Sequence, residues 1–431
     1  MRKASIVSIG NELLNGQTLN TNALYLSERL LSIGIPVVSS YTIGDDIDSI
    51  VRMLNLASDD ADLILVTGGL GPTDDDVTRQ AFAKFLGSEL ELQNNLLEKI
   101  QNIFASKNWP MPEKNKIQAY IPANAKAIEN NLGTAPGIRV DSKSKSFFVL
   151  PGVPWEMKQM FEESVLKELK KFAGEQAVAM LKLKCFGAGE SSIAEKLGEL
   201  MQRGRNPLIN CTVHYGVVTL TIIATAKDKV KAQQMAEEDE KTLREILGEL
   251  IYGTGEQSLA EVVGAKLAHQ KKTIAVAESC TGGTLAKLLT DTAGASRYFT
   301  HGWVTYSNTA KIKELGVKAE LIEEDGAVSC KVAEAMAQGA RKRAETDFGI
   351  GITGIAGPGG GSESAIKPVS PSARRGGRDF AKGEQKPVGL VYISIDSGSG
   401  SETKRFIFSY GRDFMRLQAA QTALNMLRLK L

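Results

Sequence analysis

The sequence has few histidines and cysteines for its length of 431 residues. It contains only three histidines, so a metal centre built from histidines is not expected, and any metal would have to rely on carboxylates. The cysteines are too scattered for a zinc knuckle or a disulfide framework, and we expect them to be reduced thiols. They are Cys185, Cys211, Cys280 and Cys330.

The sequence also lacks an excess of charge of either sign. It has 52 Lys and Arg residues against 50 Asp and Glu residues, which gives a net charge of +2. Binding nucleic acid through a broad basic face would need a clear excess of positive charge, so direct contact with nucleic acid is not expected. No apolar run reaches the roughly 18 residues that a membrane span needs, and no apolar leader follows Met1. We therefore expect a cytoplasmic protein without a membrane partner.

The length exceeds what a single hydrophobic core usually supports, so two or three domains are expected. The hydrophobic share of 42% and the charged share of 24% are those of an ordinary globular protein. Gly174, which breaks a helix rich in Lys and Glu, and a glycine-bearing linker at 252–256 mark the boundaries. We predict three domains, at residues 1–172, 178–254 and 257–431.

The first 70 residues alternate between strand and helix patterns. Strands are predicted at 5–9, 36–42 and 62–67, helices at 22–33 and 46–57, and a polar loop at 10–21. This βαβ order is typical of an open α/β sheet, which binds ligands at the carboxyl ends of its strands.

The segment after the third predicted strand combines glycines with acidic residues. Residues 68–78 read Gly-Gly-Leu-Gly-Pro-Thr-Asp-Asp-Asp-Val-Thr. Glycines allow backbone amides to approach phosphates, and Asp75 and Asp76 could hold a hard divalent cation against them. A surface turn that caps the helix starting near Thr78 would explain the same acidic residues. A second glycine-bearing loop, at 131–137, favours the ligand-binding interpretation.

Residues 178–254 predict a small α+β module that links the two larger domains. Its strands are expected at 180–186 and 217–226, and its helices at 193–201 and 230–247. Ser191 is expected to cap the first of these helices, and His214 is expected to lie in a loop.

We expect the most reactive side chain of the protein to lie in the segment 273–283. An apolar run at 273–277 predicts a strand and helical spacing resumes at 284, so residues 278–283 must turn the chain from strand into helix. Ser279 and Thr281 would then lie at the first turn of a helix, where unpaired N–H groups favour an anion or an oxyanion. Gly282 and Gly283 would let a ligand approach the backbone closely. The alternative is that one hydroxyl only caps the helix.

Later segments supply candidate partners for this turn. If a strand ends at Tyr306 and a helix begins near Asn308, the side chains of Tyr306 and Lys311 can reach the same end of the sheet. A loop at 354–361, after a predicted strand at 347–353, is too rich in glycine for packing alone. Ser329 is expected only to cap a helix at 331–344, and Ser258 to cap one at 259–269.

Four motifs resemble the amino-terminal half of CinA, the competence/damage-inducible protein family. They are Gly-Asn-Glu-Leu-Leu-Asn-Gly at 10–16, the segment 67–78, Gly-Thr-Ala-Pro-Gly at 133–137 and Leu-Pro-Gly-Val-Pro-Trp-Glu-Met at 150–157. That half is similar to molybdopterin-binding domains, which implies a three-layer α/β fold. Family members have been assigned a metal-dependent ADP-ribose pyrophosphatase activity, which implies ADP-ribose as substrate and Mg, Mn or Co as the cation.

By this resemblance Asp75 and Asp76 fall on the metal- and phosphate-proximal positions, and Asp46 is a further candidate. The other residues implied for the amino-terminal site are Glu12, Gly69, Gly71, Thr73 and Thr78. Two alternatives stay open. The amino-terminal half could bind a pterin or nucleotide without cleaving it, or the chain could be an interaction protein related to competence.

Three further motifs resemble the carboxyl-terminal half of the same family, whose stand-alone relatives are nicotinamide-nucleotide amidases. They are Ala-Glu-Ser-Cys-Thr-Gly-Gly at 277–283, Val-Thr-Tyr-Ser-Asn at 304–308 with Lys311, and Thr-Gly-Ile-Ala-Gly-Pro at 353–358. The resemblance implies a homodimer that hydrolyses nicotinamide mononucleotide to nicotinate mononucleotide and ammonia without a cofactor.

The same resemblance assigns roles to individual residues. Ser279 would attack the carboxamide, neutral Lys311 would take its proton, and Tyr306 would orient the lysine or relay the proton. Backbone amides after Ser279 and the Thr281 hydroxyl would hold the oxyanion. Cys280 is a rival nucleophile, ranked lower because the resemblance places the attack on the serine. The residues implied to bind substrate are Gly282, Gly283, Thr353, Gly354, Gly357 and Arg412.

Residues 362–385 depart from the family pattern. Lys-Pro-Val occurs at 367–369 and again at 386–388, and only the second copy leads into Gly389 and a predicted strand, so the first belongs to an insertion. The insertion is too polar and too rich in glycine and proline to bury a core, which predicts a mobile loop. Arg374, Arg375 and Arg378 could close over a nucleotide as a loose lid, or could lie in a solvated surface loop.

Overall fold

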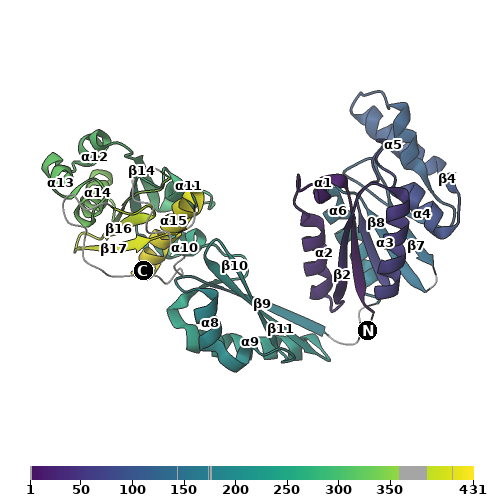
Figure 1. The fold of residues 1–431 in the computed structure, drawn as a ribbon, viewed down its shortest axis with the longest axis horizontal. Coiled ribbons are helices and arrows are strands. Elements are labelled where there is room, and N and C mark those ends of the chain that lie inside the picture. The colour runs from purple at the N-terminus through teal and green to yellow at the C-terminus, as the bar shows by residue number, and fades with distance from the viewer. Residues whose placement is uncertain (1, 143, 173, 175–176, 359–385, 410) are drawn as a thin grey trace. The chain divides into compact units, whose positions relative to one another are not determined.

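The computed structural model describes residues 2–142, 144–172, 174, 177–358, 386–409 and 411–431 (Figure 1). The predicted insertion at 362–385, with its three arginines, lies outside the described residues. Contacts divide the chain into two units, Met1–Ala179 with Ala224–Gln234 and Met180–Ile223 with Met235–Leu431, and each is described by itself. Among the described helices, none combines the length and the apolar composition that crossing a bilayer requires.

A six-stranded sheet with the order β2-β1-β3-β8-β7-β6 organises the amino-terminal unit. β2, β1, β3 and β8 run parallel, whereas β7 pairs antiparallel with both β8 and β6. The carboxyl ends of the four parallel strands therefore meet at one edge of the sheet. The strands are β1 (Ala4–Ile9), β2 (Val37–Ile43), β3 (Leu63–Thr67), β6 (Lys126–Ile128), β7 (Gly137–Ser142) and β8 (Lys145–Leu150).

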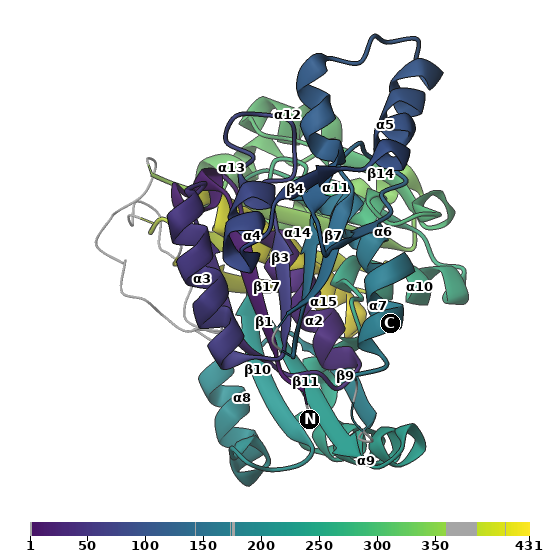
Figure 2. The same cartoon turned by 90° about the vertical axis from the view of Figure 1, so that its right-hand side faces the viewer.

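Helices cover both faces of this sheet because successive strand side chains point to opposite sides. On one face α2 (Thr21–Ser32), α6 (Pro154–Met160) and α7 (Leu166–Leu169) share an apolar cluster with the strands. On the other face α3 (Ile47–Asp60), α4 (Thr78–Leu86) and α5 (Asn94–Ser106) build a second cluster. Figure 2 shows α3 on one side of the strands and α6 and α7 on the other. This is the expected three-layer α/β architecture.

The smaller elements of the amino-terminal unit join these layers. A π-helical segment, Phe161–Val165, connects α6 to α7, and a two-stranded sheet pairs β4 with β5. The other short elements are α1 (Asn11–Leu14), β4 (Leu90–Leu92), η1 (Glu113–Ala119) and β5 (Tyr120–Pro122).

The middle segment forms a four-stranded sheet with the order β10-β11-β9-β12. β9 spans Ala177–Cys185, β10 Leu208–His214, β11 Val217–Ala226 and β12 Ile251–Thr254. Its helices are α8 (Glu190–Leu197) and α9 (Lys229–Leu247), with short 3₁₀ turns at Gly198–Met201 and Gly248–Leu250. The segment therefore has the predicted α+β composition.

The carboxyl-terminal domain is built on a five-stranded sheet with the order β14-β13-β15-β16-β17. β13 pairs parallel with β14 and β15, and β16 pairs antiparallel with β15 and β17. The carboxyl ends of β13, β14 and β15 thus lie at the same edge. The strands are β13 (Ile274–Glu278), β14 (Phe299–Val304), β15 (Phe348–Gly354), β16 (Leu390–Asp396) and β17 (Ser401–Ile407).

This sheet is also covered by helices that share apolar clusters with it. One cluster includes α10 (Leu259–Gln270), α11 (Thr284–Thr290) and α15 (Arg412–Arg428). The other includes α13 (Ala319–Asp325), α14 (Cys330–Ala344) and the end of α12 (Asn308–Leu315). A 3₁₀ turn, Ala295–Arg297, precedes β14.

Three local expectations need correction. The segment 10–21 is not only a loop, because it contains α1. Ser191 lies inside α8, whose N-cap is Gly189, since the helix already begins at Glu190. His214 ends β10 rather than lying in a loop, because Tyr215 and Gly216 adopt positive φ and turn the chain directly into β11. The caps at Ser258 and Ser329 are confirmed, with side chains that accept the N–H of Glu261 and Val332.

Glycines let α14 approach β15 closely. A Cβ on Gly351 would lie 2.2 Å from the Ala333 carbonyl oxygen, and one on Gly349 would lie 2.1 Å from that of Ala337. Real Cβ atoms do not approach backbone oxygens so closely, so the helix would have to move. The packing of α14 on the sheet therefore depends on the absence of these side chains.

Gly351→Ala should accordingly destabilise the fold. We expect a loss of about 1–3 kcal/mol in the free energy of unfolding, because an extra methyl group overpacks the helix–strand contact. Lys342→Ala, an exposed change on the same helix, should shift it by less than about 0.5 kcal/mol. Urea-induced unfolding followed by circular dichroism measures both variants, and equal stabilities would contradict the close-packing account.

Candidate active sites

The turn after β13 is held by a buried carboxylate. Glu278 is 1% exposed, and its side chain accepts the backbone N–H groups of Gly283, Leu285 and Ala286 at 3.0, 3.1 and 2.8 Å. These are the N–H groups at the start of α11, which begins at Thr284. The prediction that Ser279 and Thr281 lie at the first turn of a helix with unpaired N–H groups is therefore wrong. The Glu278 carboxylate, and not a substrate anion, accepts the N–H groups at the start of α11.

Ser279 and Lys311 come together at the carboxyl edge of the sheet. Lys311 Nζ lies 3.0 Å from Ser279 Oγ, and it also contacts the carbonyl oxygens of Thr305 at 2.9 Å and Tyr306 at 3.3 Å. Ser279 is 7% exposed and Lys311 only 2%. The backbone fixes both residues, because the Ser279 N–H donates to Ile352 O and α12 begins one turn before Lys311.

Burial lowers the pKa of the Lys311 amine below its usual value of 10.5, because desolvation penalises the charged form. A neutral amine has two N–H donors and one lone pair. The carbonyl groups of Thr305 and Tyr306 can accept the two N–H groups, which leaves the lone pair directed at the Ser279 hydroxyl. The geometry therefore suits a lysine that removes the serine proton.

Cys280 lies beside Ser279 but in a different environment. Its thiol is buried, and this burial raises its pKa to about 12. Its sulfur packs where a side chain on Gly354 would begin, 2.9 Å from that Cβ position. Since the thiolate is the nucleophilic form, a thiol with this pKa is a poor nucleophile near neutral pH. The environment of the two residues thus favours Ser279.

Two threonine hydroxyls near this pair have no hydrogen-bond partner among the described residues. Thr281 is 0% exposed and Thr305 is 1% exposed, and Oγ1 of each is unpaired there. Buried polar groups are nearly always hydrogen-bonded in folded proteins. An unpaired Thr281 hydroxyl, one residue beyond Cys280, is compatible with its expected role as an oxyanion donor.

Tyr306 does not take the role expected of its hydroxyl. Its side chain is 62% exposed, and the hydroxyl accepts a hydrogen bond from Arg412 Nη2 at 3.0 Å. The backbone carbonyl of Tyr306, not its phenol, contacts Lys311. The physical reason is that the chain leaves β14 with this carbonyl turned inward and the ring turned to solvent. Arg412 Nη1 also donates to Gly357 O at 2.7 Å, so Arg412 joins the two loops.

Thr353 and Gly354, which were expected to bind substrate, make packing contacts within the protein. Thr353 is fully buried, and its hydroxyl donates to Ala327 O at 2.7 Å. A Cβ on Gly354 would lie 2.6 Å from the Leu390 carbonyl oxygen. Both residues therefore fix the end of β15 against its neighbours.

Arg416 is a residue of this site that the sequence analysis missed. Its Nε donates to Thr281 O at 3.0 Å, and Nη2 would lie 3.1 Å from a Cβ on Gly282. Gly282 and Gly283 both have positive φ, which suits glycine. Arg412 and Arg416 are four residues apart on α15, and this spacing on one helix face was visible in the sequence. Together they bring two guanidinium groups to the loops around Ser279.

A second candidate site lies in the amino-terminal unit, at the carboxyl ends of β1, β2, β3 and β8. It is a pocket of about 420 Å³ lined by the glycine loop, by residues 151–153 and by Gln118. No Lys or Arg side chain is among the described residues that line it. Five carboxylates line it: Glu12, Asp45, Asp75, Asp76 and Glu156. We call this space the carboxylate pocket.

The structure separates the predicted residues of this pocket into lining and supporting groups. Glu12, Gly69, Gly71, Asp75 and Asp76 line it. Asp46 does not, because its side chain caps α3 by accepting the Ser49 N–H at 2.8 Å; the preceding residue, Asp45, lines the pocket instead.

Both threonines of this set support the loop. The buried Thr78 hydroxyl donates to Gly68 O at 2.9 Å. Thr73 donates to Asp76 through its N–H at 2.9 Å and its hydroxyl at 2.5 Å. A hydrogen bond from Thr73 also lowers the pKa of Asp75, so this carboxylate stays ionised.

Arg79 lies beneath the same loop and was not anticipated. It is 1% exposed and donates to the carbonyls of Leu70 at 2.7 Å and Gly71 at 2.5 Å. Its burial lowers the pKa to about 10. Nothing in the sequence pattern marks this arginine as buried. It holds the loop from below, while the carboxylates face the pocket.

The described residues include no set of three or more His, Cys, Asp or Glu side chains arranged to hold a metal ion. The predicted pair Asp75 and Asp76 is therefore not part of a preformed cage. One of the pair, Asp76, is already engaged by Thr73.

Comparison with known families assigns three successive segments of the chain. Residues 5–171 match the family described as "Probable molybdopterin binding domain", and residues 182–253 match "Damage-inducible protein CinA KH domain". Residues 256–369 and 377–431 match "CinA C-terminal domain". The chain belongs to the CinA family.

Two relatives that match nearly the whole chain agree with this assignment. A CinA-like protein of Kosmotoga olearia is 41% identical over 427 residues, which cover 99% of this chain and 98% of the relative. A relative from Caldicellulosiruptor saccharolyticus is 40% identical over 425 residues, 99% of this chain and 98% of that protein. Among solved structures, a CinA protein from Thermoplasma acidophilum shares 34% identity over 39% of this chain and 98% of that chain, with a TM-score of 0.37.

Replacing Glu278 by Gln tests the buried clamp at the turn, by which we mean the three hydrogen bonds that the Glu278 carboxylate accepts from the start of α11. A carboxamide offers one acceptor oxygen and directs N–H groups at other N–H donors, so Glu278→Gln should lower the free energy of unfolding by about 1–3 kcal/mol. Asp291→Asn, at the exposed other end of α11, removes only a surface ion pair with Lys287 and should change stability by less than about 1 kcal/mol. Chemical denaturation compares the two, and an unaffected Glu278→Gln variant would refute the clamp.

Proposed function

We propose that the carboxyl-terminal domain hydrolyses the carboxamide of nicotinamide mononucleotide to nicotinate mononucleotide and ammonia. The observation that carries this proposal is the 3.0 Å contact between the buried amine of Lys311 and the hydroxyl of Ser279. The substrate class comes from the family resemblance, and the reaction type from the chemistry of this pair. Arg412 and Arg416 supply positive charge close to Ser279, which suits a substrate with a 5′-phosphate.

The proposed reaction proceeds in two halves. Ser279 Oγ attacks the carboxamide carbon as neutral Lys311 takes the hydroxyl proton, and the new oxyanion is stabilised by nearby donors such as the Thr281 hydroxyl. Lys311 then gives the proton to the amide nitrogen, and ammonia leaves an acyl ester on Ser279. Water, deprotonated by Lys311, attacks that ester, and the protonated lysine returns the proton to Ser279 Oγ as the carboxylate product leaves.

The nucleophile is tested by two neighbouring variants. Ser279→Ala should lower kcat for ammonia release from nicotinamide mononucleotide by about three orders of magnitude or more, as for other lost nucleophiles. Cys280→Ala, its matched control, should keep kcat within about tenfold because the thiol is buried and protonated. The reverse pattern, with loss only in Cys280→Ala, would make the cysteine the nucleophile.

The pH dependence follows from the lowered pKa of Lys311. The amine is active when neutral, so kcat/KM should rise with pH through a pKa below 10.5 and then level off. Lys311→Arg should be inactive at every pH below about 12, since a guanidinium stays protonated. A rate profile that is flat, or that falls as pH increases, would exclude Lys311 as the base.

We further propose that the amino-terminal domain cleaves ADP-ribose to AMP and ribose 5-phosphate with a divalent cation. The supporting observation is the carboxylate pocket, which has five acidic side chains and no lining Lys or Arg. Such a pocket repels a diphosphate unless a cation lies between them. Mg²⁺ is usually held by one or two carboxylates together with substrate phosphates, so Asp75 and Asp45 fit this role without a preformed cage.

When bound, the cation would neutralise charge on the diphosphate and polarise it for attack by water. The residues of the chain would orient the substrate and hold the loop, with Arg79 and Thr78 fixing the glycine backbone from below.

Metal dependence separates the two proposed activities. With a chelator present, release of AMP from ADP-ribose should stop, whereas ammonia release from nicotinamide mononucleotide should continue unchanged. Asp45→Asn should lower the rate of AMP release by at least about tenfold, and Asp46→Asn, which alters only a helix cap, should lower it by less than about threefold. If none of Mg²⁺, Mn²⁺ and Co²⁺ supports AMP release, the proposed hydrolysis is refuted and the amino-terminal domain only binds its ligand.

A further inference from the structure

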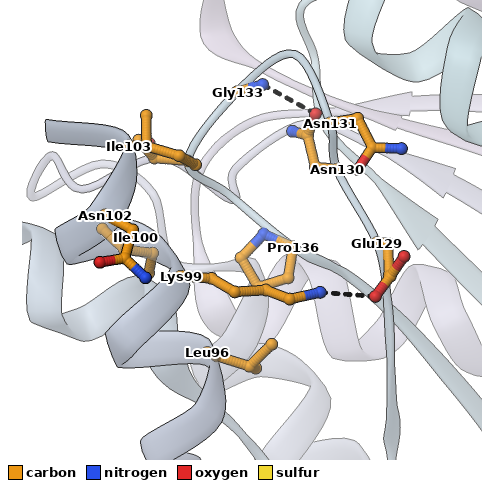
Figure 3. A pocket seen from close by; sticks show the side chains of 11 residues that line it. Leu96, Lys99, Ile100, Asn102, Ile103, Glu129, Asn130, Asn131, Gly133 and Pro136 are labelled. Carbon is orange, nitrogen blue, oxygen red and sulfur yellow. Dashed lines mark hydrogen bonds and ion pairs between the residues drawn. The ribbon is translucent and has the colours of Figure 1, made fainter. Parts of the chain in front are cut away.

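A second pocket of the amino-terminal unit lies between α5 and the chain that follows β6 (Figure 3). Its volume is about 260 Å³, and nothing in the two proposed reactions uses it. Its lining residues are Leu96, Lys99, Ile100, Asn102, Ile103, Glu129, Asn130, Asn131, Gly133, Thr134 and Pro136. We call it the α5 pocket.

The α5 pocket has an apolar wall and a polar rim. Leu96, Ile100 and Ile103 follow helical spacing on one face of α5, and Pro136 lies opposite them (Figure 3). Leu96 and Ile100 are 7% and 2% exposed, so this wall is part of the core and is preformed. Apolar walls with polar groups at the edge suit a flat heteroaromatic ring, which has apolar faces and hydrogen-bonding edges.

The charge of the α5 pocket indicates a neutral occupant. Among the described residues that line the pocket, Lys99 is the only cation and Glu129 the only carboxylate, and the two pair at 2.5 Å across the rim. The pair leaves no net charge to attract a phosphate or a carboxylate. Asn102, which has a carboxamide side chain, lies on the same rim and is exposed to solvent.

The α5 pocket and the carboxylate pocket share a wall. Thr134 lines both of them. Asn130 connects the two sides, because its Oδ1 accepts the N–H groups of Leu132 and Gly133 and its Nδ2 donates to Glu156 at 2.7 Å. Glu156 lines the carboxylate pocket. The two pockets are therefore neighbours on either side of the segment 130–134.

We propose that the α5 pocket binds the nucleobase of a nucleoside diphosphate whose diphosphate lies in the carboxylate pocket. The proposal rests on the proposed diphosphate chemistry of that pocket for its substrate class. A volume of about 260 Å³ falls below the roughly 300–1,000 Å³ of pockets that enclose a whole ligand, so it suits one end of a longer molecule. The neutral pocket takes the base, and the acidic pocket takes the cation-bound diphosphate.

Filling the α5 pocket tests this assignment with AMP and ribose 5-phosphate as probes, each with Mn²⁺, on the full chain. Ile103→Trp should weaken AMP binding by about tenfold or more and leave ribose 5-phosphate binding within about twofold, since only AMP carries a base. Ile103→Ala, which removes apolar wall instead, should also weaken AMP binding. Gln101→Trp, an exposed change on the same helix outside the pocket, should change neither. Isothermal titration calorimetry measures all four proteins.

Several outcomes would overturn the proposal. They are AMP binding that survives in Ile103→Trp, an equal loss of both probes in both Ile103 variants, or a wild-type protein that binds AMP no more tightly than ribose 5-phosphate. A change of oligomeric state in Ile103→Trp with unaltered AMP binding would make the α5 pocket a subunit contact instead. Binding of AMP does not require hydrolysis, so the two proposals can fail separately. If Ile103→Trp loses AMP binding alone while the wild-type protein does not cleave ADP-ribose, the proposed hydrolysis is refuted and the assignment of the α5 pocket to the nucleobase is supported.

Discussion

The desolvation of the Lys311 amine is the constraint on which the carboxyl-terminal site depends. A lysine that is 2% exposed is costly to keep charged, and among the described residues no carboxylate forms an ion pair with it. The carbonyl groups of Thr305 and Tyr306 accept its hydrogens without supplying a negative charge. The amine can therefore exist in its neutral form next to Ser279, and the surrounding fold serves to keep water and charge away from it.

The other charged groups around the turn are also kept apart from the Lys311 amine. Glu278 is one residue from Ser279, yet its carboxylate is directed away from the lysine and into the N–H groups at the start of α11. The two arginines of α15 contact loop carbonyls and the Tyr306 hydroxyl from the solvent side. The amino-terminal unit has the opposite arrangement, with its arginine buried beneath the loop and its carboxylates facing the pocket. One chain thus carries two candidate sites with opposite arrangements of charge.

Sequence periodicity was enough to predict most of the elements, whereas the pairing of Ser279 with Lys311 was implied by the family resemblance. Apolar runs located β13 and β15, and a strand-to-helix change after Tyr306 placed Lys311 near the same sheet edge. Periodicity could not tell which of two adjacent groups faces a site. Asp46, which was expected at the site, caps α3, and the neighbouring Asp45 lines the pocket instead. Tyr306 contacts Lys311 through its backbone carbonyl and not through its phenol. Burial of Arg79 and the clamp by Glu278 depend on contacts across the turn that no local pattern encodes.

The protonation state of Lys311 is the most direct measure of this account. In protein labelled with ¹³C at lysine Cε, the Lys311 resonance can be assigned by its loss in Lys311→Arg, and its shift can be followed against pH. The account predicts that Lys311 loses its proton at a pH below 10.5, and at lower pH than the surface lysines. A Lys311 resonance that titrates with the surface lysines, or above them, would contradict it.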